Sequence, residues 1–182
     1  MPGADVGSAD PVRVRLLEAT SGVLAQHGPR KLSLTDIAAV AGVSRPTLYR
    51  HFASKDDLLR ALATHEKVRF STELDAALAA VPEAERLDRA LRFIVEFQQD
   101  YPMRGLVVIE PSFMLDQLER SLRTMAGALV PLFEELAPAV TSGSIEAADL
   151  ADLLVRTALS HFLIRGDDQQ LLRQLRHVVG LP

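Results

Sequence analysis

The stretch that decides the fold is residues 33–55, which read SLTDIAAVAGVSRPTLYRHFASK. Ser33 followed three residues later by Asp36 is a capping box, a pattern that begins a helix. Gly42 can end that helix because glycine adopts a positive φ without steric cost, and Ser44 can cap the next helix. The spacing therefore predicts two short helices joined by a tight turn.

These two helices have the properties of a helix-turn-helix. Ala38 is small enough to let the second helix approach the first, and Val43 can fill the corner between them. Arginine can pair with guanine and threonine can meet a thymine methyl, whereas tyrosine, histidine and lysine suit phosphate. Arg50 could instead be a solvated surface charge, and Lys55 could simply lie in the first turn of the next helix. We expect DNA contacts from Thr35, Arg45, Pro46, Thr47, Tyr49, Arg50, His51 and Lys55.

The stretch resembles the DNA-binding domain of the TetR family of bacterial regulators. The resemblance covers residues 11–65 and rests on motifs that agree in order and spacing: Ile37–Ala38, Ala41–Gly42–Val43–Ser44, Thr47–Leu48–Tyr49, His51–Phe52, Ser54–Lys55 and Leu58–Leu59. It implies an all-helical homodimer that contacts DNA through its second and third helices. It also implies repression that a ligand relieves, without identifying that ligand.

The charge distribution fits this interpretation although the chain has a net charge of −4. Residues 1–60 contain eight Lys and Arg against six Asp and Glu, whereas residues 61–182 contain twelve against eighteen. Attraction to phosphate is local, so the basic excess matters where it lies. The first third of the chain is therefore the part suited to nucleic acid.

The rest of the sequence also predicts helices, because glycine and proline occur at intervals typical of helix ends and alternating strand patterns are missing. The fold class is therefore all-α. We expect a long fourth helix from Ser54 to Pro82, a fifth ending before Tyr101, a longer one from Ser112 that Pro131 kinks or ends, a loop at 138–144, and closing helices at 145–165 and 168–179. Residues 1–10 are expected to be disordered, 11–60 to form the helix-turn-helix domain, and 61–182 to form a helical effector-binding and dimerisation domain.

The second domain contains aromatic and methionine residues that can fill a core or line a cavity for a small, largely apolar effector. The pocket residues that we expect are Phe93, Phe97, Met103, Val107, Glu110, Phe113, Met114 and Phe162. Glu110 can alternatively cap the helix that follows it. The last two helices each have an apolar face, so two subunits can pair them in a four-helix interface, although these faces can also cover only their own core.

Several classes of protein are excluded or disfavoured by the composition. The chain has no cysteine, so disulfides, thiolate metal sites and thiol catalysis are impossible. The five histidines are scattered, and no nucleophile elbow or glycine-rich phosphate loop occurs. We expect a cytoplasmic regulator that is not an enzyme, needs no metal or cofactor, and does not bind membranes.

Two alternatives remain at this point. One is a constitutive helical DNA-binding protein without an effector, which a missing cavity would favour. The other is a helical module whose helix-turn-helix serves contacts with protein, which specific binding to an operator would exclude.

Overall fold

The computed structural model describes residues 10–164 and 166–181, and every regular element in these ranges is helical. The predicted all-α fold is thus confirmed. The predicted disorder of residues 1–10 falls almost wholly on residues that lie outside the described ranges. The elements are α1 (Pro11–His27), α2 (Leu34–Val40), α3 (Arg45–His51), α4 (Lys55–Ala79), α5 (Glu83–Gln99), η1 (Pro102–Gly105), α6 (Leu106–Ile109), α7 (Pro111–Leu136), α8 (Pro138–Thr141), α9 (Ala147–Leu163) and α10 (Asp168–Val179).

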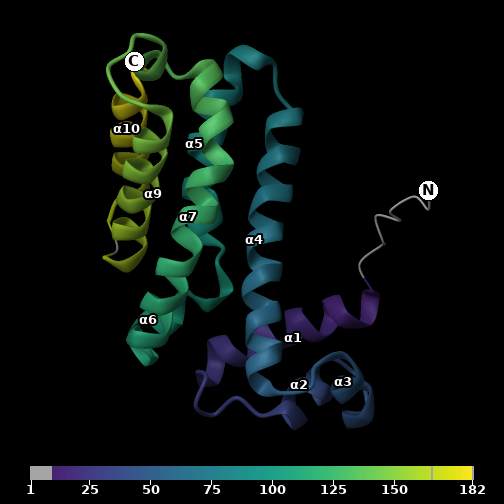
Figure 1. Cartoon of the computed structure of the whole chain (residues 1–182). Helices are drawn as coiled ribbons and strands as arrows, with labels where there is room; N and C mark the ends of the chain where they lie inside the picture. Colours follow the sequence, from purple (N-terminus) through teal and green to yellow (C-terminus); the bar gives the residue numbers. More distant parts are fainter. Residues whose placement is uncertain (1–9, 165, 182) are drawn as a thin grey trace, which may run out of the picture.

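Helices α1, α2 and α3 gather at one end of the molecule, around the start of α4 (Figure 1). The α1 helix begins at Asp10, whose side chain accepts a hydrogen bond of 2.9 Å from the backbone N–H of Val12. It ends at Gly28, which adopts a φ of 73° that favours glycine. Leu16, Leu24 and other apolar side chains of α1 are buried against α2, α3 and α4. Their burial holds the three short helices in one domain.

The long α4 helix connects this domain to the second one, running from the three-helix end along the side of the C-terminal bundle (Figure 1). Its first apolar residues, Leu58 and Leu62, belong to the core of the N-terminal domain. Phe70 and Leu74, further along, belong to the core of the C-terminal bundle. One continuous helix joins the two hydrophobic cores without a flexible linker. A movement at one end of α4 is therefore transmitted to the other end. The domain boundary at residue 60 remains a prediction.

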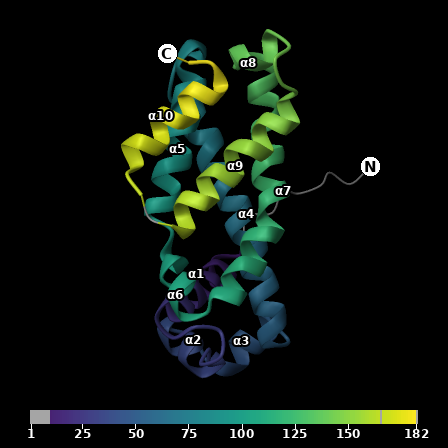
Figure 2. The same ribbon diagram turned by 90° about the vertical axis from the view of Figure 1, so that its left-hand side faces the viewer.

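In the C-terminal domain α5 and α7 pack against α4, while α9 and α10 pack on α7 and α5, and α9 crosses the face of α7 (Figure 2). The α7 helix runs through Pro131 to Leu136, so Pro131 does not end it. Pro131 is exposed, while Leu129, Leu132 and Phe133 around it are buried, and this packing keeps the helix intact despite the missing N–H. The expected loop at 138–144 is only partly a loop, because Pro138–Thr141 forms the single turn of α8.

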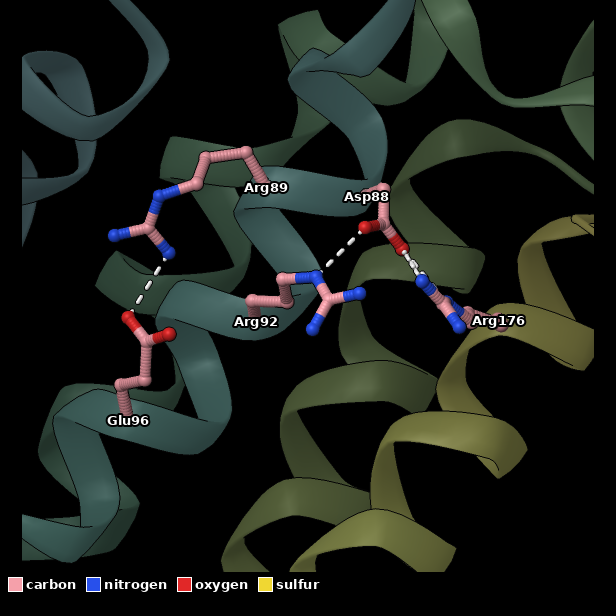
Figure 3. A network of polar contacts seen from close by, with 5 residues as sticks. All are labelled: Asp88, Arg89, Arg92, Glu96 and Arg176. Carbon is pink, nitrogen blue, oxygen red and sulfur yellow. Dashed lines mark hydrogen bonds and ion pairs between the residues drawn. The ribbon is translucent and has the colours of Figure 1, made fainter. Parts of the chain in front are cut away.

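A network of ion pairs joins α5 to α10 on the surface of the bundle (Figure 3). Asp88 accepts hydrogen bonds from Arg92 Nε at 2.8 Å and from Arg176 Nε at 2.6 Å. On the same helix Arg89 donates to Glu96 at 2.9 Å. Partial burial opposes the ionisation of Asp88, but the two arginines outweigh it and lower the pKa of this carboxyl below its ordinary value. Asp88 therefore ties α10 to α5 in its ionised form.

Candidate DNA-binding face and sensor cavity

The turn between α2 and α3 has the geometry that the sequence predicts. Ser33 Oγ accepts hydrogen bonds from the N–H groups of Thr35 and Asp36 at 3.2 and 3.4 Å, and so caps α2. Gly42 adopts a φ of 66° at the turn. Ser44 Oγ accepts from the N–H of Thr47 at 3.2 Å and caps α3. The two helices are thus fixed at their N-termini by side chains of the chain itself.

One side of α3 is buried and the other faces solvent. Leu48 is fully buried, and the Phe52 that follows the helix is 1 % exposed. Arg45, Pro46, Tyr49 and Arg50 are exposed on the opposite side, as is Thr35 at the start of α2. Thr47 is partly buried and its hydroxyl lies 2.8 Å from Ser44 Oγ. The result is a rigid, exposed surface with two arginines and a tyrosine.

Two of the residues expected to contact DNA are engaged within the chain. The His51 side chain is 13 % exposed, and its Nδ1 lies 3.4 Å from Asp10 Oδ2 at the start of α1. The ammonium group of Lys55 donates a hydrogen bond to the backbone carbonyl of Pro29, in the connection between α1 and α2. Both side chains therefore brace the three-helix domain, and a phosphate contact by either one would require it to leave its present partner.

A small, largely apolar cavity lies between α4, α5, α7 and α9. Aromatic rings form a connected wall: the ring centroids of Phe70 and Phe97 are 5.1 Å apart, those of Phe97 and Tyr101 6.3 Å, and those of Tyr101 and Phe162 5.9 Å. The other residues that line the cavity are Glu66, Lys67, Gln98, Leu118, Ser121, Met125 and Leu159. Its apolar lining with a few polar groups is typical of a site for a small organic ligand.

A second small cavity adjoins the first and extends it toward the N-terminal domain. The two share Glu66, Tyr101 and Ser121. The lining of the second cavity includes Leu24 of α1, and Met103 of η1 lines it as well. An occupant of the combined space would therefore contact a helix of the N-terminal domain directly.

Comparison with known proteins identifies the N-terminal architecture. Residues 16–62 match the model of the family described as bacterial regulatory proteins, tetR family. These residues therefore have the sequence of a tetR-family domain. The match confirms, for this part of the chain, the resemblance that its motifs predict.

Individual relatives extend the match beyond the helix-turn-helix. The chain is 38% identical over 116 residues to the HTH-type transcriptional repressor LfrR of Mycolicibacterium smegmatis, which is 63% of this chain and 59% of LfrR. It is 35% identical over 89 residues to the uncharacterized HTH-type transcriptional regulator Rv1255c of Mycobacterium tuberculosis, covering 48% and 44%. The chain thus matches less than two thirds of the length of either relative. An alignment of 116 residues is longer than the helix-turn-helix domain, so the similarity to LfrR reaches into the second domain.

The whole fold also has counterparts among solved structures. The fatty acid degradation regulator FadR from Bacillus halodurans superimposes with a TM-score of 0.73, covering 95% of this chain and 96% of FadR, at 18% sequence identity. Identity at this level supports the shared fold and nothing finer.

The two cavities include only some of the pocket residues that the sequence predicts. Phe97 and Phe162 line the first cavity, and Met103, Phe113 and Met114 line the second. Phe93, Val107 and Glu110 line neither. The Phe93 ring packs behind the wall, with its centroid 5.4 Å from that of Phe70 and 5.5 Å from that of Phe97. The role of all eight residues as ligand contacts remains a prediction.

Glu110 occupies a position between the two domains. It is the residue immediately before α7, but its side chain makes no capping hydrogen bond to that helix. Its Oε1 instead lies 3.4 Å from Arg30 Nε in the connection after α1. The site of a Cβ on Gly28 would lie only 3.2 Å from Glu110 Cγ, so the start of α7 packs closely on the end of α1.

Gln98, a buried polar residue that lines the first cavity, was not among the pocket residues predicted from the sequence. Its spacing from Leu91, Ile94 and Val95 places it on the buried stripe of α5, and that pattern was the available signal. Within the described residues no set of three or more His, Asp or Glu side chains is arranged to hold a metal ion. No described helix is both long and apolar enough to cross a membrane.

Proposed function

We propose that this chain is a sequence-specific transcriptional repressor of the TetR family that binds a palindromic operator as a homodimer and leaves it when a small, largely apolar effector binds. The observation that carries the proposal is the exposed face of α3. Arg45 and Arg50 are exposed there, and neither takes part in a salt bridge within the described part of the chain. Their charges are therefore available to DNA.

Direct reading of base pairs requires a rigid helix whose N-terminal residues reach the major groove. Arg45 is the first residue of α3 and follows the Ser44 cap, so it lies where a groove-binding helix needs its base contact. Tyr49 is 46% exposed one turn further along and suits a phosphate contact. Thr35 is placed at the first turn of α2, where backbone N–H groups also favour phosphate.

Dimerisation is proposed through α9 and α10. These helices form the outer edge of the bundle, with one side packed on α5 and α7 and the other side uncovered (Figures 1 and 2). Exposed apolar side chains on α9 and directly after it are Leu153, 44% exposed, and Ile164, 76% exposed. Two copies that pair these helices would form a four-helix interface and present two α3 helices to one duplex.

Release by an effector is proposed because the cavities lie on the path between the two domains. A ligand that favours a different spacing of the recognition helices can shift the population only by its difference in affinity between the two states. The second cavity touches Leu24 of α1, and α4 borders both cavities, so occupancy is coupled to the elements that carry α3. A constitutive DNA-binding protein would need no such space, which favours the effector-responsive function.

The proposal is tested with the wild-type protein and two arginine variants on a duplex selected by the wild type from a random pool. Arg45→Ala should weaken binding by about 1–3 kcal/mol and relax specificity at one base pair in each half-site. Arg123→Ala, which removes an exposed arginine of α7, should leave affinity unchanged and serves as the matched control. Equal loss of affinity for selected and random duplexes in Arg45→Ala would contradict a base contact by this residue.

A further inference from the structure

The first cavity contains a buried polar group without a partner. Gln98 on α5 is 6% exposed, yet within the described part of the chain neither its Oε1 nor its Nε2 has a hydrogen-bond partner. Burying an amide without hydrogen bonds is costly, and buried polar groups in proteins are nearly always paired. A side chain of this kind that lines an apolar cavity points to a partner that enters the cavity.

The surroundings of Gln98 restrict what that partner can be. The lining contributes one carboxylate, Glu66, and one ammonium group, Lys67. Glu66 is already bound, since its Oε2 accepts hydrogen bonds from Arg69 Nε at 3.1 Å and from Arg69 Nη2 at 2.9 Å. Lys67 also lines the open surface hollow next to the cavity, which includes Asp116. The lining therefore has no net charge, and its carboxylate is already paired with Arg69.

The remaining polar wall is uncharged as well. Burial and the nearby Glu66 carboxylate raise the pKa of Tyr101 well above its ordinary value, so the phenol keeps its proton at neutral pH. The rings of Phe70, Phe97 and Phe162 complete the wall around the amide. Such a lining favours a flat apolar molecule, with hydrogen bonding concentrated at Gln98.

We propose that Gln98 is the polar anchor of the effector site, and that the effector class is a neutral, flat molecule with a hydrogen-bond donor and an acceptor side by side on one edge, as in a lactam. A primary amide satisfies such an edge completely: Nε2 donates to the ligand carbonyl while Oε1 accepts from the ligand N–H. This inference rests on the sensor function proposed above and adds to it the class of ligand and the residue that selects it.

Binding of three small probes to the full chain tests the proposal by calorimetry. 2-Quinolinone has the donor and acceptor on one edge, 1-methyl-2-quinolinone lacks the donor, and 2-naphthoate has a similar shape with a negative charge. The wild type should bind 2-quinolinone about tenfold or more tightly than either of the other two, since both of those lack the N–H donor and leave the buried Oε1 without a partner.

Gln98→Leu removes the amide with little change in volume, and Gln26→Leu changes an exposed amide of α1 as the matched control. In Gln98→Leu the preference for 2-quinolinone over its methyl derivative should fall close to onefold. The thermal midpoint of the ligand-free variant should equal or exceed that of the wild type, because an unpaired buried amide is replaced by an apolar group. Gln26→Leu should retain the wild-type preference.

Three results would overturn the proposal: tighter binding of 2-naphthoate or of the methyl derivative by the wild type, no binding of 2-quinolinone, or a retained preference in Gln98→Leu. A lowered thermal midpoint of ligand-free Gln98→Leu would also overturn it, since the amide would then have a structural partner. Operator binding by the wild type is measured separately. Specific DNA binding without 2-quinolinone binding would refute only the ligand class, whereas absence of specific DNA binding would refute the proposed function itself.

Discussion

Two glycines of the N-terminal domain should respond in opposite directions to the same substitution. Gly42, at the turn between α2 and α3, has a φ of 66°, while Gly22 lies inside α1. A Cβ would meet nothing within 4 Å at either position, so neither substitution creates a clash. Gly42→Ala forces an L-residue into the left-handed region at about 1–2 kcal/mol, offset in part by the lower entropy of the unfolded chain. Gly22→Ala should stabilise by about 0.8–1 kcal/mol, the difference in helix propensity.

The assay is urea unfolding followed by circular dichroism at one fixed protein concentration, because association shifts apparent stability. Gly42→Ala should unfold at lower urea than the wild type and Gly22→Ala at higher urea. Together the two variants should differ by about 1.5–2.5 kcal/mol in free energy of unfolding. A shift of the same sign in both variants would refute the assignment of the left-handed turn to Gly42, and with it the geometry of the helix-turn-helix.

Three further outcomes follow from the structure. Asp88→Asn should destabilise the fold by about 1 kcal/mol or less at pH 7, since the ion pair with Arg176 is partly exposed. Because folding lowers the pKa of Asp88, the difference in free energy of unfolding from the wild type should shrink as the pH falls below about 4, toward the folded pKa. Urea titrations measure this difference, with Asp75→Asn as the control. Leu153→Glu should convert a dimer to monomers in analytical ultracentrifugation. Val68→Glu, which changes another exposed apolar residue, 59% exposed on α4, should leave the dimer intact. A dimeric Leu153→Glu protein would place the interface elsewhere. Leu48→Ala should lower the free energy of unfolding by about 2–5 kcal/mol, and a loss below 1 kcal/mol would contradict the burial of this side chain under α3.

Local signals in the sequence were sufficient for most of the fold. Helix ends follow from a few residues near the end itself, which is why the last helix was predicted at 168–179 and is observed at Asp168–Val179. The same holds for Ser33, Gly42 and Ser44, whose capping and turn roles depend on neighbours within three residues. Pro138–Thr141 was expected in a loop because a single helical turn leaves little periodic pattern.

The sites were harder to predict because they depend on which helices meet. The hydrogen bond from Lys55 to Pro29 spans 26 residues, and the His51–Asp10 pair spans 41, so no local pattern indicates that these side chains are engaged. Phe93 and Phe97 lie one turn apart on the same face of α5, yet only Phe97 lines the cavity, because Phe93 lies further along the helix and packs behind the rings of Phe70 and Phe97. Gln98 was visible as a polar residue on a buried stripe, but its lack of a partner can be recognised only when every neighbouring element is in place.

We propose above all that this chain recognises a particular DNA sequence as a dimer. The most direct test is selection of bound sequences from a random duplex pool by the wild-type protein at two salt concentrations. We expect enrichment of one palindrome whose half-sites lie one helical turn apart, about 34–36 Å, or a small multiple of it, and we expect this enrichment to persist at the higher salt concentration. Recovery of unenriched sequences, with binding that disappears at the higher salt concentration, would show only nonspecific attraction to phosphate and would contradict the claim.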